Sequence, residues 1–183
     1  NFTGSTETGR RLAEAAGRQL KRVVLELGGY NPLIVLADAD VEYAVNASAF
    51  GAFMHQGQIC MSARRIIVER PIADEFTQRL ADKTKGLKAG DPKEQDTIIG
   101  PLINEGALEL VKSRVDDAVA KGAKVLAGGD VVGSCYQATV LAEVPAESDF
   151  AKHETFGPVV GIEVVDSADE AVERANATSY GLS

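Results

Sequence analysis

The sequence predicts an α/β fold in which a largely parallel sheet is covered by helices on both faces. Short apolar runs alternate with amphipathic segments along the chain, and strands connected through helices pair in parallel and are buried on both faces. Of the 183 residues, 45% are hydrophobic and 25% are charged, which is a globular composition. No repeat, low-complexity tract or linker divides the sequence, so we expect one domain or slightly more.

Each predicted strand is a short apolar run that ends at turn residues. The run 23–27 carries Glu26 between apolar residues and stops at Gly28, and we expect this strand to be buried. The predicted strands are 23–27, 33–36, 65–68, 124–127, 137–141 and 159–165.

Each predicted helix repeats its apolar residues with a period of about 3.6 residues, so that one side can pack on the sheet. Ser5 or Thr6 is suited to cap the first helix, and Pro71 fits the first turn of the third. Gly57 and Gly122 are suited to end the second and the fourth. The predicted helices are 6–20, 41–57, 71–87, 104–121 and 167–177.

Charge and cysteine content argue against several classes of protein. The formal net charge is −8, from 19 Lys and Arg against 27 Asp and Glu, and we expect no nucleic-acid partner. The longest apolar stretches, 33–37 and 49–54, are far shorter than the ~18 residues of a membrane span, so we expect no membrane insertion. Cys60 and Cys135 are too few for a disulfide framework, which favours a cytoplasmic location. The sequence has no H-x-x-x-H or C-x-x-C spacing, so we expect no metal site.

The two ends of the sequence indicate a piece of a longer polypeptide. The first residue is Asn1 rather than Met, and the segment that follows it resembles the end of a strand. Residues 180–183 form no recognisable terminal element. We therefore expect further residues on both sides, and the lack of a visible signal peptide carries little weight.

Cys60 and Glu26 are the residues whose positions favour catalysis. Cys60 follows a Gly-containing turn at the end of a helix and precedes a strand, where rigid elements can hold a nucleophile. A lone intracellular cysteine is also often a small buried apolar residue. Glu26, on an apolar run, could act as a general base or simply reach solvent from a strand end. Each feature alone leaves both interpretations open.

Other segments give weaker signals. Residues 2–9 run from a strand into a Gly-containing helix start, where backbone N–H groups favour a phosphate. Residues 154–158 form a Gly-Pro turn before a strand. His55 or His153 could pair with Cys60 in a thiol hydrolase, although nearness in sequence does not establish such a pair.

Taken together, four motifs resemble the aldehyde dehydrogenase superfamily in their order and spacing. Cys60 follows Glu26 by 34 positions, which matches the interval in that family. The likeness covers essentially the whole chain. The motifs are Phe2-Thr3-Gly4-Ser5-Thr6, Glu26-Leu27-Gly28-Gly29 with Asn31-Pro32, Gly57-Gln58-Ile59-Cys60 and Glu154-Thr155-Phe156-Gly157-Pro158.

The resemblance implies two domains and an acyl-enzyme reaction. Residues 1–27 would be the last piece of a Rossmann-like NAD(P)-binding domain, and residues 28–183 would be most of the catalytic domain. Cys60 would be the nucleophile that attacks the aldehyde carbonyl. Glu26 would activate the water that hydrolyses the resulting thioester.

The resemblance also implies a nicotinamide cofactor, NAD or NADP. Glu154 would hydrogen-bond the nicotinamide ribose, with Phe156 beside it. Four further residues would lie at the cofactor, with Ser5 at its pyrophosphate. These residues are Gly4, Ser5, Leu27 and Gly28.

The substrate implied is a small-molecule aldehyde, and the whole enzyme would be a homo-dimer or homo-tetramer. The run 53–62 resembles bacterial aromatic aldehyde dehydrogenases of the benzaldehyde, salicylaldehyde and vanillin type. The stripe of Phe and Met side chains at Phe50, Phe53 and Met54 is nevertheless more typical of a core than of a pocket.

Three alternatives stay open. One is a CoA-acylating enzyme, against which the presence of Glu26 argues. Another is a structural or binding member of the fold that has lost its chemistry. The third is a cofactor-free thiol esterase, in which His55 or His153 would activate Cys60.

Overall fold

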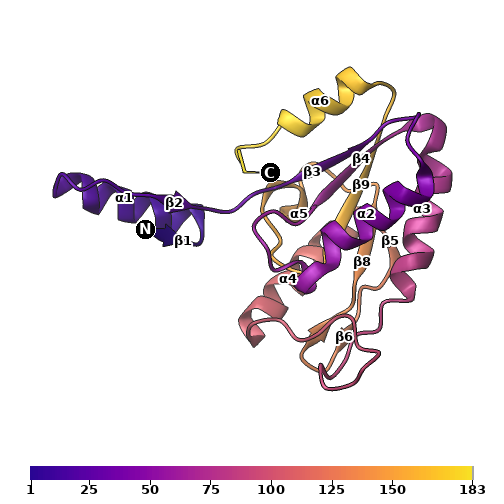
Figure 1. Cartoon of the computed structure of the whole chain (residues 1–183), viewed down its shortest axis with the longest axis horizontal. Coiled ribbons are helices and arrows are strands. Elements are labelled where there is room, and N and C mark those ends of the chain that lie inside the picture. The colour runs from indigo at the N-terminus through magenta and orange to yellow at the C-terminus, as the bar shows by residue number, and fades with distance from the viewer. Residues whose placement is uncertain (183) are drawn as a thin grey trace.

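A five-stranded sheet forms the centre of the molecule in the computed structural model, which describes residues 1–182 (Figure 1). Its strands are β3 (Pro32–Val35), β4 (Arg65–Glu69), β9 (Val159–Val165), β8 (Thr139–Ala142) and β5 (Lys124–Ala127). They lie in the order β3-β4-β9-β8-β5; the first four are parallel, and β5 is antiparallel to β8. The prediction of a largely parallel sheet is confirmed.

Helices cover both faces of this sheet, as the sequence predicts. They are α2 (Val41–Phe53), α3 (Arg70–Lys85), α4 (Glu105–Ala120) and α6 (Ala168–Asn176). Successive strand residues point to opposite faces, so Ile66 packs with Phe76 of α3, whereas Ile67 packs with Ala171 of α6. α2 and α3 bury the first face, and α4 and α6 bury the second. Removal of both faces from water supplies the main driving force for folding.

Periodicity and capping predict most element ends to within two residues. β5 and β9 have the predicted bounds, and Asn104 caps α4 by accepting a hydrogen bond from the Ala107 N–H at 2.8 Å. The prediction that the second helix continues to Gly57 is wrong, because α2 ends at Phe53. A short 3₁₀ turn, η1 (Met54–Gly57), follows it, since its last three residues adopt left-handed backbone angles that cannot continue an α-helix.

Residues 1–27 form an arm that extends away from the sheet (Figure 1). Its elements are β1 (Phe2–Thr3), α1 (Thr6–Arg18) and β2 (Leu25–Glu26), and the two strands pair in parallel. The prediction of a buried strand over 23–27 is wrong: β2 contains two residues, and Val23 and Val24 are 42% and 58% exposed. Within residues 1–182, β1 is the only strand that pairs with β2, and no second layer covers the Val23 and Val24 side chains.

Three elements were not predicted because each is too short to show a period. They are β6 (Val131–Val132), β7 (Cys135–Tyr136) and α5 (Asp149–Lys152). Cys135 is buried, and its thiol donates to the Gly90 carbonyl at 3.4 Å, which supports a structural role for this cysteine. Within residues 1–182, no helix has the length and apolarity needed to cross a membrane.

Candidate active site

Cys60 lies in the loop between η1 and β4, and its side chain is half-buried. Its carbonyl oxygen accepts a hydrogen bond from Asn31 Nδ2 at 2.7 Å, and the Ser62 carbonyl accepts from the same amide at 3.0 Å. Asn31 is buried and directly precedes β3. A buried amide that bonds two carbonyls of one loop restricts the backbone on both sides of it. The thiol is therefore carried by a loop in a defined position.

The turn that precedes Cys60 has an unusual backbone. His55, Gln56 and Gly57 have φ angles of 52°, 55° and 64°, a left-handed conformation that costs a non-glycine residue about 1–2 kcal/mol. A Cβ atom on Gly57 would overlap the carbonyl oxygen of Gly157. Glycine at this position therefore lets the segment around Gly157 pack directly against the cysteine loop.

Arg64 joins these two segments through its side chain. Its guanidinium donates to the carbonyls of Gly57, of Ile59 at 3.2 Å and of Gly157 at 2.8 Å. It also lies over the Phe156 ring, 5.7 Å from the ring centroid, within the range of a cation–π contact. Burial lowers the pKa of Arg64 to about 10, so the side chain remains a cation at neutral pH.

Glu154 is the half-buried carboxylate of this region. Its Oε1 accepts the Gly29 N–H at 3.3 Å, and a Cβ atom on Gly28 would overlap its Oε2. The Glu154 backbone is held as well, because its N–H donates to Tyr180 Oη at 3.2 Å and its carbonyl accepts from Arg114. The carboxylate therefore lies directly over the Gly28–Gly29 backbone.

Four of the predicted site residues are brought together by these contacts: Gly29 connects three of them, and Arg64 links Phe156 to the cysteine loop. A Cβ atom on Gly29 would lie 3.0 Å from the Cys60 carbonyl oxygen, so the same glycine segment contacts the cysteine loop and the Glu154 carboxylate. Phe156 is 42% exposed beside them. The four residues are Gly28, Cys60, Glu154 and Phe156.

Glu26 lies at the end of β2, two residues before this glycine pair, and is exposed. It lines a cavity of about 320 Å³ together with Leu27, Gly28 and residues 179–182, and Cys60 is not part of that wall. The exposure follows from the uncovered face of the arm described above. The expectation that Glu26 sits on a buried strand is therefore wrong for this chain.

The remaining predicted residues lie on the arm, around the start of α1. Ser5 caps this helix: its hydroxyl accepts the Thr8 N–H at 3.3 Å and donates to Thr8 Oγ1 at 3.0 Å. Gly4 lies against the Phe2 ring, and Leu27 packs against Gly9 of α1. Gly4 and Ser5 thus belong to the arm, away from the contacts that hold Cys60.

The two histidines lie outside this set of contacts. His55 and His153 are both exposed, and within residues 1–182 no hydrogen bond joins either imidazole to the Cys60 thiol. This arrangement gives no support to the thiol esterase alternative. No group of three or more His, Cys, Asp or Glu in the same part of the chain is arranged to hold a metal ion.

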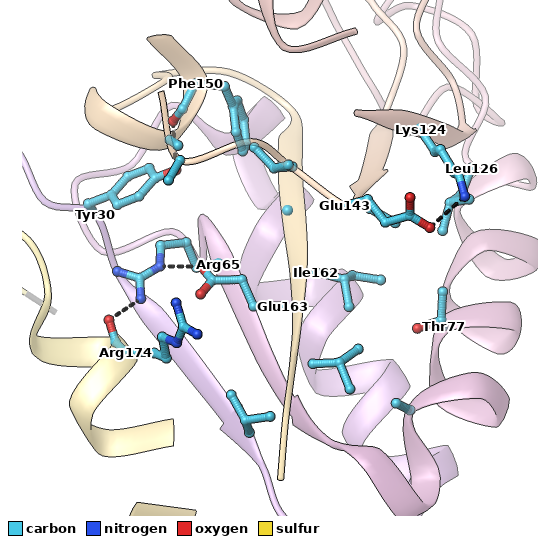
Figure 2. Close-up of a pocket in the computed structure, with 18 of the residues that line it drawn as sticks. Tyr30, Arg65, Thr77, Lys124, Leu126, Glu143, Phe150, Ile162, Glu163 and Arg174 are labelled. Atoms are coloured by element: carbon cyan, nitrogen blue, oxygen red, sulfur yellow. Dashed lines mark hydrogen bonds and ion pairs between the residues drawn. The ribbon is translucent and has the colours of Figure 1, made fainter. Parts of the chain in front are cut away.

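A larger cavity, of about 1100 Å³, lies between α3 and β9 and contains none of the predicted site residues (Figure 2). Arg65 there pairs with Glu163 Oε1 at 2.8 Å and donates to the Arg174 carbonyl. Tyr30 donates to the Phe150 carbonyl at 2.6 Å. The side chains of the neighbours Arg64 and Arg65 therefore lie in different regions, and only the Arg64 guanidinium bonds the cysteine loop.

Sequence reasoning did not assign a site role to several residues that hold this region. A charged residue directly before an apolar strand predicts contact with solvent, so the sequence did not lead us to expect that Arg64 is buried. The adjacent pair of arginines before three apolar residues is the one pattern that could have indicated it. The unassigned residues are Asn31, Arg64, Arg114 and Tyr180.

The fold and these contacts define an α/β protein whose candidate site is built around a cysteine loop. The model of the aldehyde dehydrogenase family matches residues 1–183. The chain belongs to the aldehyde dehydrogenase family, and the resemblance seen in its four motifs is confirmed.

The most similar relatives include enzymes named for aromatic aldehydes. The benzaldehyde dehydrogenase [NAD(+)] of Pseudomonas putida is 50% identical over 182 residues, which cover 100% of this chain and 37% of the relative. The vanillin dehydrogenase of Pseudomonas fluorescens is 46% identical, with coverage of 100% and 38%. The crystal structure of a salicylaldehyde dehydrogenase from Pseudomonas putida G7, complexed with salicylaldehyde, has a TM-score of 0.95 and 46% identity, with coverage of 100% and 38%. The chain thus spans somewhat over a third of the length of these proteins.

Replacement of Glu154 by Gln is expected to alter stability in a pH-dependent way. Burial raises the pKa of the Glu154 carboxyl, opposed by the Gly29 N–H and by the charges of Arg64 and Arg114. The native state therefore binds a proton before the unfolded chain does as the pH falls, and this stabilisation is lost as the pH rises through the folded pKa. Gln does not titrate, so we expect the Tm of Glu154→Gln relative to wild type to be higher at pH 7 than at pH 4. Thermal unfolding at both pH values, with the exposed Glu173→Gln as control, measures this; an equal difference at both would contradict it.

Proposed function

We propose that the whole protein oxidises an aldehyde, of aromatic type, to the carboxylic acid with NAD or NADP as the electron acceptor, and that Cys60 is its nucleophile. The observation that carries this proposal is the position of Cys60 on a loop that Asn31 and Arg64 hold against the segment bearing Glu154. Membership of the aldehyde dehydrogenase family supports the reaction type. The relatives named above support the substrate class.

Cys60 has the chemistry required for the first step. Its thiolate adds to the aldehyde carbon and forms a thiohemiacetal, and the carbonyl oxygen becomes an oxyanion. The Cys60 N–H donates to no backbone carbonyl within residues 1–182, which leaves it free to donate to that oxyanion. The bonds from Asn31 keep the peptide that follows Cys60 from turning away.

Glu26 is proposed to activate the water that hydrolyses the thioester. Its cavity of about 320 Å³, with polar and apolar walls, is large enough to admit water to the carboxylate. Gly28 and Gly29 connect β2 to the segment that touches the Cys60 carbonyl. This short connection supports a role for Glu26 at the thioester.

The residues around Glu154 fit a nicotinamide nucleotide. A carboxylate can accept hydrogen bonds from both hydroxyls of a ribose, and the exposed Phe156 ring beside it offers an apolar face. When bound, the cofactor supplies the acceptor for the hydride that leaves the substrate. We propose that Glu154 and Phe156 hold its nicotinamide end. The backbone at Gly4, Ser5, Leu27 and Gly28 would lie along the rest of it.

The domain division follows the same proposal. Residues 1–27 would belong to the cofactor-binding domain and residues 28–183 to the catalytic domain, which agrees with the separation of arm and sheet in Figure 1. The proposed assembly of the whole protein is a homo-dimer or homo-tetramer.

Preference for an aromatic aldehyde is tested at Phe50. The stripe of Phe and Met side chains divides: Phe53 is 3% exposed and belongs to the core, whereas Phe50 on α2 and Met54 directly after it are 67% and 50% exposed near the end that leads to Cys60. We expect Phe50→Ala to lower kcat/KM for benzaldehyde about tenfold relative to a short aliphatic aldehyde, because an apolar contact of that size discriminates to this extent. Tyr43→Ala, an exposed aromatic at the far end of the same helix, is the matched control.

The measurement uses the whole protein with benzaldehyde, salicylaldehyde and a short aliphatic aldehyde, and follows formation of NADH and NADPH. Equal losses for both aldehyde types in Phe50→Ala would contradict the aromatic preference. A folded wild-type protein that reduces neither cofactor with any of the aldehydes would show that the proposed function is wrong.

A further inference from the structure

We propose that Arg64 is a positioning residue that holds the Cys60 loop in register with the Glu154–Gly157 segment. This inference rests on the proposed function, in which Cys60 is the nucleophile and Glu154 binds the cofactor. The Arg64 guanidinium bonds the loop of the first residue and the segment of the second. Arg64 touches neither substrate nor cofactor in this proposal. It acts through the loops that it joins.

The first support is the way in which Arg64 is buried. It is 1% exposed and the largest fully buried side chain among the described residues. A buried charge is costly unless it is well hydrogen-bonded, and Arg64 meets this cost with three backbone carbonyls rather than with a carboxylate in the described chain. An apolar residue of the same size would pack without that cost. The arginine therefore has a role other than filling space, which we assign to its hydrogen bonds.

The second support is which carbonyls it bonds. Gly57 and Ile59 both lie within three residues of the nucleophile, and Gly57 closes the left-handed turn. The third carbonyl, of Gly157, belongs to the segment that carries Glu154. One rigid, planar group thus fixes the distance between the two loops.

The third support is the effect of the charge on the Glu154 side of the site. The guanidinium lies over the Phe156 ring, and its charge favours the ionised form of Glu154. The same group that holds the cysteine loop therefore also favours the state of Glu154 that accepts hydrogen bonds. A misplaced loop would disturb both halves of the site together.

The chain offers a matched control in Arg65. This neighbour is also a buried arginine, 5% exposed, but it pairs with Glu163 and bonds the Arg174 carbonyl in the separate cavity of Figure 2. Arg65→Met removes a buried charged side chain that makes no hydrogen bond to the cysteine loop; its remaining contact is with the Tyr30 ring, 5.4 Å from the ring centroid. Loss of stability alone would therefore affect both variants alike.

The test compares Arg64→Met, Arg64→Lys and Arg65→Met in the whole protein, at a temperature at which each is folded. We expect Arg64→Met to lower kcat about 100-fold with the KM of the aldehyde changed less than about threefold, because a small displacement of a reacting group costs this much. The rate at which iodoacetamide alkylates Cys60, measured without aldehyde or cofactor, should rise about threefold or more, because a loosened loop opens more often. Arg64→Lys should recover part of kcat, and Arg65→Met should match wild type in both measurements.

The two readouts separate the possible outcomes. Arg64→Met with kcat and alkylation rate within about twofold of wild type would overturn the proposal, as would equal changes in Arg65→Met. If Arg64→Met does not fold, Arg64→Lys decides in the same way. If the wild-type protein oxidises no aldehyde, the proposed function is wrong, and the alkylation rates still test the role of Arg64 because they need no turnover.

Discussion

Cys60→Ser in the whole protein is expected to lower kcat for aldehyde oxidation by about 10⁴-fold or more, because loss of a covalent nucleophile removes the reaction path itself. A serine hydroxyl is almost wholly protonated at neutral pH and is a far weaker nucleophile than a thiolate. The substitution changes one atom of a half-buried side chain. The fold and the Tm should therefore stay close to those of wild type.

The measurement is the initial rate of NADH or NADPH formation, with Tm as the check on folding. Cys135→Ser is the matched control, because this cysteine is buried beside Gly90 and contacts none of the residues at the candidate site. We expect that control to keep most of the wild-type kcat. A Cys60→Ser variant that keeps more than about a tenth of the wild-type rate would show that another group is the nucleophile.

Glu26→Gln is expected to lower steady-state turnover by about 10² to 10⁴, the range that general acid–base catalysis contributes. The first half of the reaction needs only the thiol. The variant should therefore still form about one reduced cofactor per active subunit in a rapid burst before the thioester stalls. Because Glu26 is exposed at the end of β2, the substitution should leave the Tm unchanged.

A rapid-mixing experiment separates the burst from the steady state. Glu14→Gln is the control, since this exposed glutamate lies on the same arm and pairs only with Arg18 across one helical turn. Normal steady-state turnover in Glu26→Gln would remove Glu26 from the mechanism. Loss of both the burst and the steady state would assign it to an earlier step.

Local pattern was enough to predict the sheet and most helix ends. β9 and β5 are apolar runs between clear turn residues, and Asn104 caps α4 where the sequence places a cap before an apolar repeat. The family was predicted from four short motifs, whose order and spacing can be read from one sequence. Each of these signals depends on residues that are close together in sequence.

The remaining features depend on contacts between distant residues, and so they were not predicted. Val23 and Val24 have an apolar pattern, but no layer of residues 1–182 covers them. The end of α2 is set by a left-handed turn whose glycine has to clear the Gly157 carbonyl. The burial of Arg64 requires carbonyl groups from both sides of the site. None of these contacts can be predicted from the residues next to each position in the sequence.

The bond between Arg64 and the Gly157 carbonyl has a consequence for biosynthesis. The two residues are 93 positions apart, so a ribosome that adds 5–20 residues per second makes Gly157 about 5 to 20 s after it makes Arg64. Until then the left-handed turn before Cys60 lacks one of its anchoring segments. During that interval the cysteine loop has the partners for its bonds from Asn31, but the third carbonyl that Arg64 bonds has not yet been made.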